Sequence, residues 1–222
     1  MKEYYALLDA ATSVKEKVAY TLLYTGGLRS GAAFSLTWDS VDFENSFLVV
    51  MNREGTADMP PFHVKDHESR RIPLPKHTID LLTEWQAQAP EGVPYILLTR
   101  DRYEQVKVKW QQLCKEGKEW QNRYMANNVL RNFKKHYEQA GIKPVGKLTI
   151  HTLRKSCGQN WADHLPMHVV KKLMGHSNIA TTQDIIHRLI RITRRKLQGQ
   201  FSSFWKRKRT YKPISGRIGD VA

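Results

Sequence analysis

The sequence has few cysteines and no long apolar run. Cys114 and Cys157 are the only two cysteines among 222 residues, and they do not form a CxxC pair. We therefore expect neither a disulfide scaffold nor a cysteine zinc site, and a reducing intracellular setting fits. No stretch approaches the ~18 apolar residues of a membrane span. Charged residues also stand where a signal peptide would be apolar, so no secretion route is visible.

Acidic residues are in short supply. The 36 Lys and Arg outnumber the 21 Asp and Glu, which gives a formal net charge of +15. Such a surplus points to a polyanionic partner. Nucleic acid is favoured over a membrane surface, because the basic residues are interleaved with a folded-type sequence and no long amphipathic anchor stands apart.

The hydrophobic patterning predicts an α+β fold that is mostly helical, with a small three-stranded antiparallel sheet. Ser13 can cap a helix that ends near Gly26 and Gly27. Residues 41–51 and 62–75 both follow a strand, turn, strand pattern. Residues 95–98 fit either a short buried strand or the start of a loop. Helical periodicity recurs over residues 76–88, 102–117, 126–141, 151–163, 168–174 and 178–190.

Four short segments carry residue types suited to phosphate chemistry. Arg29 follows a Gly-Gly turn, and Lys65 lies beside a polar turn in the second strand, turn, strand segment. His151 and Arg154 are three residues apart and share one helical face. His176 lies in a Gly-His-Ser turn between two predicted helices. Each segment alone is ordinary, since a lone surface Arg or turn His is usually structural or solvated.

Together, and in this order, the four segments resemble the catalytic domain of the tyrosine recombinase (phage integrase) family over roughly residues 13–190. The matching stretches are TGGLRSGAAFSLTWDSVDF, VKDHESRRIPLP, HTLRKSCGQNWADH and KKLMGHSNIATT. The resemblance implies that Arg29 and Arg154 clamp the scissile phosphate. It makes Lys65 the acid for the leaving 5′ oxygen, His151 the acid/base histidine and His176 a second phosphate support. Fixed guanidinium groups stabilise charge at phosphorus without a metal, so we expect no cofactor and no metal site.

The nucleophile of the family is missing. Its tyrosine would lie nine residues beyond His176, where this chain has Ile185. Isoleucine has no nucleophilic atom, so the chain is expected not to cleave DNA. Three explanations for Ile185 compete. The chain is a degenerate or engineered recombinase, or it is a relative retained for DNA binding, or another chain or segment supplies the tyrosine. Tyr211 is a remote candidate for such a tyrosine. Ala32 also departs from the family, which often carries an acidic residue there.

Two functions remain open at this point. The first is the catalytic domain of a site-specific DNA recombinase or integrase, acting through a 3′-phosphotyrosine and cleavage-dead as written. The alternative is a non-catalytic DNA-binding or regulatory protein on the same scaffold. A third and weaker reading is a general basic nucleic-acid binder whose motif matches are accidental.

Domain organisation follows the resemblance. The resemblance predicts that residues 1–190 form the catalytic domain, that residues 191–222 form a basic C-terminal segment, and that the N-terminal DNA-binding domain of the family is absent. Two alternatives are equal for the C-terminal segment: it docks on a neighbouring copy, or it packs back on its own chain. From Lys206 onward, a solvated tail is an equal alternative to a packed segment. We expect double-stranded DNA as a partner, self-association as a dimer or tetramer, no membrane, and a cytoplasmic location, at the nucleoid in a prokaryote. The further expected DNA contacts are Arg70, Arg71, Lys155, Arg188, Arg191, Arg194 and Arg195.

Overall fold

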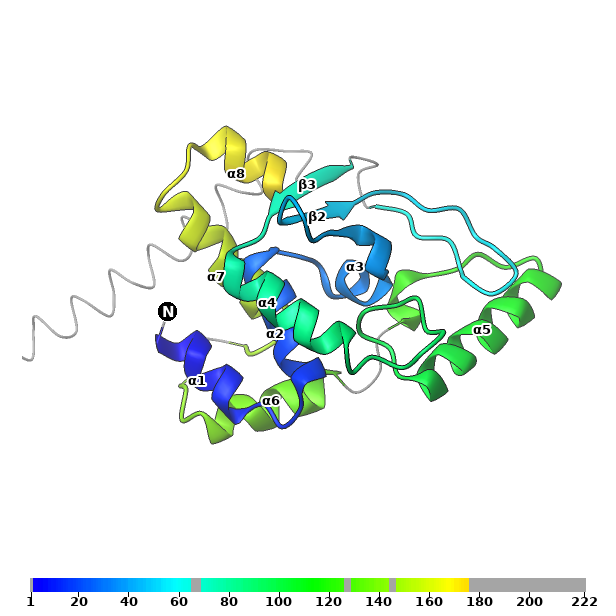
Figure 1. Ribbon diagram of the computed structural model, residues 1–222, viewed down its shortest axis with the longest axis horizontal. Helices are drawn as coiled ribbons and strands as arrows, with labels where there is room; N and C mark the ends of the chain where they lie inside the picture. Colours follow the sequence, from blue (N-terminus) through cyan, green and yellow to red (C-terminus); the bar gives the residue numbers. More distant parts are fainter. Residues whose placement is uncertain (1, 65–68, 126–128, 144–146, 176–222) are drawn as a thin grey trace, which may run out of the picture.

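A computed structural model describes residues 2–64, 69–125, 129–143 and 147–175. It is mostly helical with one small sheet, so the predicted fold class is confirmed (Figure 1). The elements in chain order are α1 (Lys2–Ala10), α2 (Val14–Thr25), α3 (Ser30–Ser35), the 3₁₀ turn η1 (Trp38–Ser40), β1 (Val41–Asp42), β2 (Phe47–Val50), β3 (Arg70–Pro73), α4 (Lys76–Gln86), α5 (Arg100–Lys115), the 3₁₀ turn η2 (Asn122–Tyr124), α6 (Val129–Gln139), α7 (His151–Ala162) and α8 (Met167–Met174).

The sheet is antiparallel, with the strand order β1-β2-β3. Leu48 on β2 pairs with Val41 on β1 and with Ile72 on β3, and all three side chains are buried. Because side chains alternate across a strand, the neighbours of these residues face the opposite side of the sheet. The sheet therefore has one face on the core, and its third strand leads directly into α4.

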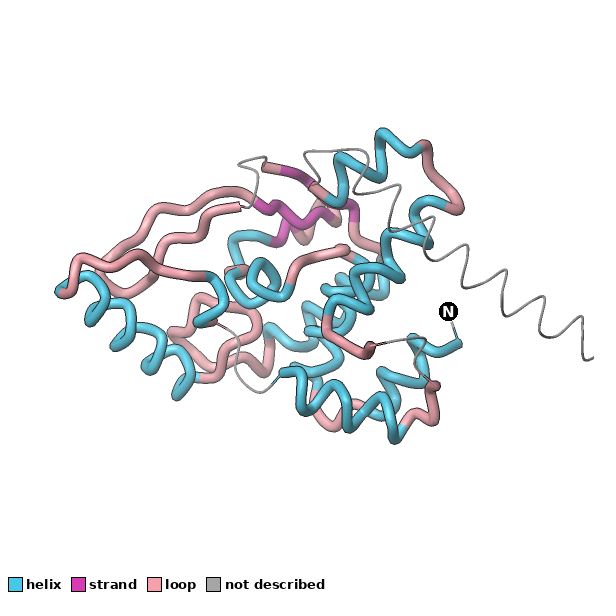
Figure 2. The backbone as a smooth tube through the Cα atoms, turned by 180° about the vertical axis from the view of Figure 1, so that it is seen from behind, coloured by secondary structure: helices cyan, strands magenta, loops and turns pink. Residues whose placement is uncertain are grey.

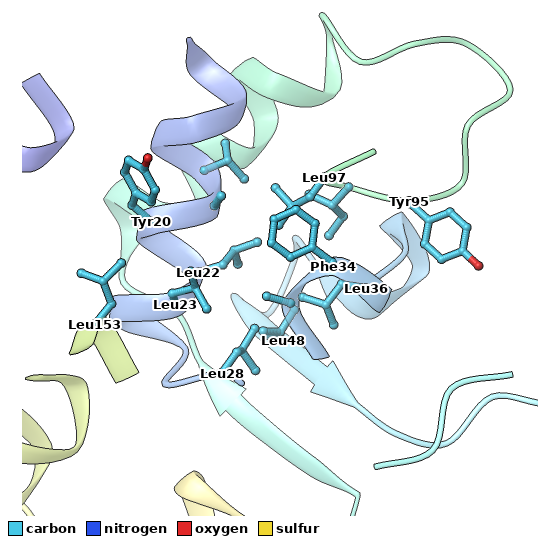
Figure 3. Packing of buried hydrophobic residues seen from close by; sticks show 14 of the residues in the cluster. Tyr20, Leu22, Leu23, Leu28, Phe34, Leu36, Leu48, Tyr95, Leu97 and Leu153 are labelled. Atoms are coloured by element: carbon cyan, nitrogen blue, oxygen red, sulfur yellow. The ribbon is translucent and has the colours of Figure 1, made fainter. Parts of the chain in front are cut away.

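Helix α2 runs through the centre of the molecule. Ser13 caps it as predicted, since its hydroxyl accepts the backbone N–H of Glu16 at 3.3 Å. The helix packs against α4 and α7, and Leu22 and Leu23 are almost fully buried. Figure 3 shows these leucines facing side chains of α3, β2 and α7. Each such burial contributes about 1.5–3 kcal/mol, so the core fixes the ends of α2, α3 and α7 relative to one another.

Helix α1 was not expected from the sequence. It lies beside α6 in the ribbon and in the tube seen from behind (Figures 1 and 2), and Tyr4 holds it to α2. The Tyr4 hydroxyl donates to Thr21 Oγ1 at 2.9 Å, and its ring stacks on Tyr24 with centroids 4.2 Å apart. Burial raises the pKa of Tyr4 to about 12. Tyr4, Leu7 and Leu8 stand at helical spacing, and that spacing was the available signal.

A buried polar contact fixes α6 on α2. The Tyr20 hydroxyl lies 2.9 Å from Nδ1 of His136, whose side chain is almost fully buried. Glu16 accepts a hydrogen bond from Asn132 Nδ2 at 2.9 Å. Buried polar groups are tolerated only with such partners, so this network sets the position of α6 as well as contributing to packing.

The segment after β2 differs from the prediction. Residues 62–64 were expected as a strand, but Phe62 makes only one isolated bridge, to Arg53. The connection leaves the sheet and runs alongside α5 (Figure 1), where the Trp110 indole Nε1 donates to the Thr56 carbonyl at 2.8 Å. This packing on α5 takes the place of strand pairing. The sequence of residues 95–98 fits either a strand or a loop, and the structure shows a buried loop with one bridge from Tyr95 to Thr37.

Two kinds of feature are absent from the described residues. Within the ranges given above, no helix has the length and apolar character that crossing a bilayer requires. In the same part of the chain, no three His, Cys, Asp or Glu side chains come together as a metal site would need.

Candidate active site

The turn between α2 and α3 sets the position of Arg29. The chain leaves α2 through Gly26 and passes Gly27 in the left-handed region, at φ +55°. Leu28 is fully buried, which anchors the turn, and Arg29 precedes the first residue of α3 with extended backbone. A Cβ at Gly27 would lie 3.0–3.1 Å from Trp161 and Cys157 of α7, so the turn packs directly on that helix.

Arg154 joins two of the predicted segments through their main chains. Its side chain is only 5% exposed. Nη1 donates to the Gly27 carbonyl, and Nη2 donates to the Met174 carbonyl at 2.7 Å. Met174 is the last residue of α8, where the helix dipole favours a cation. The guanidinium therefore fastens the turn before Arg29 to the end of α8, immediately before Gly175 and His176.

His151 lies at the start of α7, one turn before Arg154. Its pKa is lowered from the ordinary value of 6.5, first by partial burial of the ring and then by the positive charges of Arg154, Arg29 and Lys155. These charges act on the ring because the fold brings them close to it. The structure thus gathers Arg29, His151 and Arg154 in one place, and the neutral ring can accept a proton near pH 7.

We expect an NMR titration of His151 to give a pKa below 6.5. Arg29→Gln is expected to raise that pKa toward the ordinary value, because one positive charge is removed. Arg71→Gln, on the outer face of β3, serves as the control and leaves it unchanged. Folding favours the neutral imidazole, so stability rises with pH between the folded-state pKa and 6.5. Equal titration curves for the Arg29 and Arg71 variants would contradict this arrangement.

Arg70 and Arg71 are adjacent on β3 but lie on opposite faces. Arg71 is 58% exposed, pairs with Asp42 at 3.1 Å and covers the Phe47 ring. Arg70 is 7% exposed and packs on Gly175, where a Cβ would meet its Nη1 at 2.6 Å. The alternation of side chains along a strand turns Arg70 inward, and the expected DNA contact at Arg70 stays a prediction. In this structure Arg70 supports the end of α8.

We expect alanine variants of Arg70 and Arg71 to differ in how their DNA affinity depends on salt concentration. Arg71→Ala is expected to lower the salt slope of DNA affinity by about one, as loss of one phosphate contact does. Arg70→Ala is expected to leave the slope unchanged and to cost about 1–3 kcal/mol in urea unfolding, because a buried side chain is removed. A smaller salt slope for Arg70→Ala would support the predicted DNA contact at Arg70.

Several expected site residues lie outside the described part of the chain. They are Lys65, His176, Ile185, Arg188, Arg191, Arg194 and Arg195. Lys155 is exposed on α7 beside Arg154. The carbonyls of Gly27 and Met174 were missed by sequence reasoning, because a main-chain acceptor leaves no trace in residue type.

Comparison with known proteins shows which family the chain resembles. The profile of the phage integrase family matches residues 1–189. The tyrosine recombinase XerA of Thermococcus onnurineus is 26% identical over 173 residues, which cover 78% of this chain and 50% of the relative. A crystal structure of XerA recombinase superposes with a TM-score of 0.60 at 17% identity, covering 89% of this chain and 61% of that one.

A second solved structure is a lambda integrase dimer bound to a COC′ core site. It superposes with a TM-score of 0.55 at 17% identity and covers 83% of this chain and 56% of that one. The chain spans about half the length of the curated relatives it matches. With the matched profile spanning α1 to beyond α8, the chain belongs to the phage integrase family.

Proposed function

We propose that this chain is the catalytic domain of a site-specific DNA recombinase or integrase that works on double-stranded DNA without a metal. The observation that carries the proposal is the Arg154 guanidinium, which ties the Arg29 turn to the end of α8. Two arginines and a neutral histidine in one place suit a phosphodiester, because fixed donors stabilise the charge that develops on its oxygens. The DNA in the lambda integrase structure supports the same substrate class.

The residues divide the reaction among them. Arg29 and Arg154 hold the non-bridging oxygens of the scissile phosphate, with His176 as a further support. His151 takes the proton of the attacking hydroxyl as its oxygen bonds to phosphorus. The bond from phosphorus to the 5′ oxygen breaks, and Lys65 supplies the proton to that oxygen. The family reaction leaves a 3′-phosphotyrosine, which a second strand then resolves.

In this chain the reaction stops at binding, because Ile185 stands at the position of the tyrosine. The same residue favours the second candidate, a DNA-binding or regulatory protein that occupies a site without cutting it. Either way residues 1–190 act as the catalytic-type domain. The basic residues 191–222 bind DNA or a second copy in a dimer or tetramer. A DNA substrate places the protein in the cytoplasm, at the nucleoid if the host is a prokaryote.

Covalent capture tests the proposal. The protein as given and its Ile185→Tyr variant are incubated with nicked suicide duplexes drawn from the DNA that flanks the gene, then separated in SDS. We expect an SDS-resistant adduct with Ile185→Tyr alone, because only that variant has a nucleophile. If both proteins shift the DNA in a gel but neither forms an adduct, the DNA-binding alternative is favoured. An adduct with the protein as given would overturn the assignment of Ile185.

A further inference from the structure

The chain that leads into Lys65 is held at three consecutive residues. Phe62 and Arg53 exchange two backbone hydrogen bonds, of 2.8 and 2.9 Å. The carbonyl of His63 accepts from Asn122 Nδ2 at 3.1 Å, and the N–H of Val64 donates to Asn52 Oδ1 at 2.8 Å. The Val64 side chain is also buried. The chain is therefore held up to Val64, the residue that precedes Lys65 in the sequence.

Asn122 also lies against the helix that begins at Arg29. A Cβ built on Gly31 would be 3.1 Å from the Cβ of Asn122, so the absence of a side chain at Gly31 permits this approach. Gly31 is two residues after Arg29, and His63 is two residues before Lys65. The single side chain of Asn122 thus touches both segments.

The turn that carries Asn122 is itself fixed. Arg102 Nη2 of α5 donates to the carbonyl of Tyr124 at the end of η2. The Trp120 ring packs edge-on against Tyr124 and against Trp110 of α5, with centroids 5.3 and 6.2 Å apart. The contacts between these partly buried rings hold the turn on α5, so Asn122 projects from a fixed turn.

We propose that Asn52 and Asn122 are positioning residues that hold His63 and Val64, the residues just before Lys65, against the segment that begins at Arg29. The inference rests on the proposed function, in which the Lys65 ammonium gives its proton to the 5′ oxygen as the bond to phosphorus breaks. Proton transfer requires hydrogen-bond reach. Release of either amide contact frees the chain before Lys65, and a displacement of about 1 Å costs on the order of 100-fold in rate.

One amide accepts its hydrogen bond and the other donates it, so the same Asn→Asp substitution at both positions gives a test with matched charge. Asn52 accepts a hydrogen bond, so Asn52→Asp keeps the acceptor while Asn52→Ala removes it. Asn122 donates, so Asn122→Asp loses the donor and turns an oxygen toward the His63 carbonyl. Both Asp variants add one negative charge near the same segment. A purely electrostatic or nonspecific effect would therefore act on both alike.

The variants are made in the Ile185→Tyr protein and assayed for adduct formation at saturating DNA. Each is tested on an ordinary suicide duplex and on one with a 5′-bridging sulfur at the scissile bond. A thiolate leaves without a proton, so the sulfur duplex reports every step except the one that needs Lys65. On the ordinary duplex we expect Asn52→Ala and Asn122→Asp to be slower by about 10- to 100-fold. Asn52→Asp should restore the rate to within about threefold of the parent, and sulfur should restore both slow variants to a similar level.

The outcomes separate the inference from the function it rests on. If the Ile185→Tyr parent captures DNA but the slow variants are not restored by sulfur, their role is structural and the inference fails. It also fails if Asn122→Asp and Asn52→Asp behave alike, or if neither Asn52→Ala nor Asn122→Asp is slow. If the parent captures neither duplex, the proposed function fails and the positioning role fails with it.

Discussion

Arg154→Ala is expected to abolish most covalent capture of DNA by the Ile185→Tyr protein. Removing one fixed donor from a developing oxyanion costs about 100- to 1,000-fold in rate, and here the same side chain also ties the Arg29 turn to α8. Both roles need the planar, forked guanidinium. Arg154→Lys keeps the charge but not the fork, and should therefore be almost as slow. Single-turnover adduct formation measures the loss.

Lys155→Ala is the matched control for that experiment. Lys155 is the next residue on α7 and is exposed, so its removal takes one positive charge from the same region without breaking a buried contact. We expect it to weaken DNA binding and to leave the capture rate at saturating DNA nearly unchanged. Similar capture rates for the Arg154 and Lys155 variants would mean that Arg154 contributes only general charge.

Gly27→Ala is expected to destabilise the fold through both backbone strain and overpacking. A residue with a Cβ at φ +55° is strained by about 1–2 kcal/mol. The new methyl group would also approach Trp161 and Cys157 at 3.0–3.1 Å, and overpacking of this kind costs about 1–3 kcal/mol. The two effects add to about 2–5 kcal/mol in urea unfolding. The displaced turn would carry Arg29 with it, so capture of DNA falls as well.

Gly92→Ala separates the backbone effect from the packing effect. Gly92 has φ +72°, and no heavy atom of the described residues lies within 4 Å of a Cβ built there. Its substitution should therefore cost only the backbone strain, about 1–2 kcal/mol. If both variants lose the same free energy of unfolding, α7 moves to accommodate the extra methyl group of Gly27→Ala without an energetic cost.

Local signals in the sequence were enough for most helices and for the sheet. The hydroxyl of Ser13 and the Gly-Gly turn bound α2 where expected, because capping depends on neighbours in the chain. The strand expected at residues 62–64 was wrong: Phe62 makes only an isolated bridge to Arg53, and His63 and Val64 bond the side chains of Asn122 and Asn52, the first of them far along the sequence. Such long-range competition is invisible to a local pattern.

The residue types of the site were predictable from the sequence, but the contacts that hold them in place were not. Arg29, His151 and Arg154 were chosen for their chemistry, and the fold brings them together. The burial of Arg70 against Gly175 and the carbonyls that hold Arg154 depend on tertiary packing. Two adjacent arginines look identical in a sequence until the face of the strand is known.

The bridge made by Arg154 also bears on when a newly made chain acquires its site. Gly27 and Arg154 are 127 residues apart, and Met174 follows Arg154 by another 20. Contacts of such separation form late, since the loop they close is entropically costly. On the ribosome, α2 and α3 emerge long before α7 and α8. A product truncated before α7 therefore carries Arg29 without Arg154 and His151, and it cannot bind DNA with an assembled site.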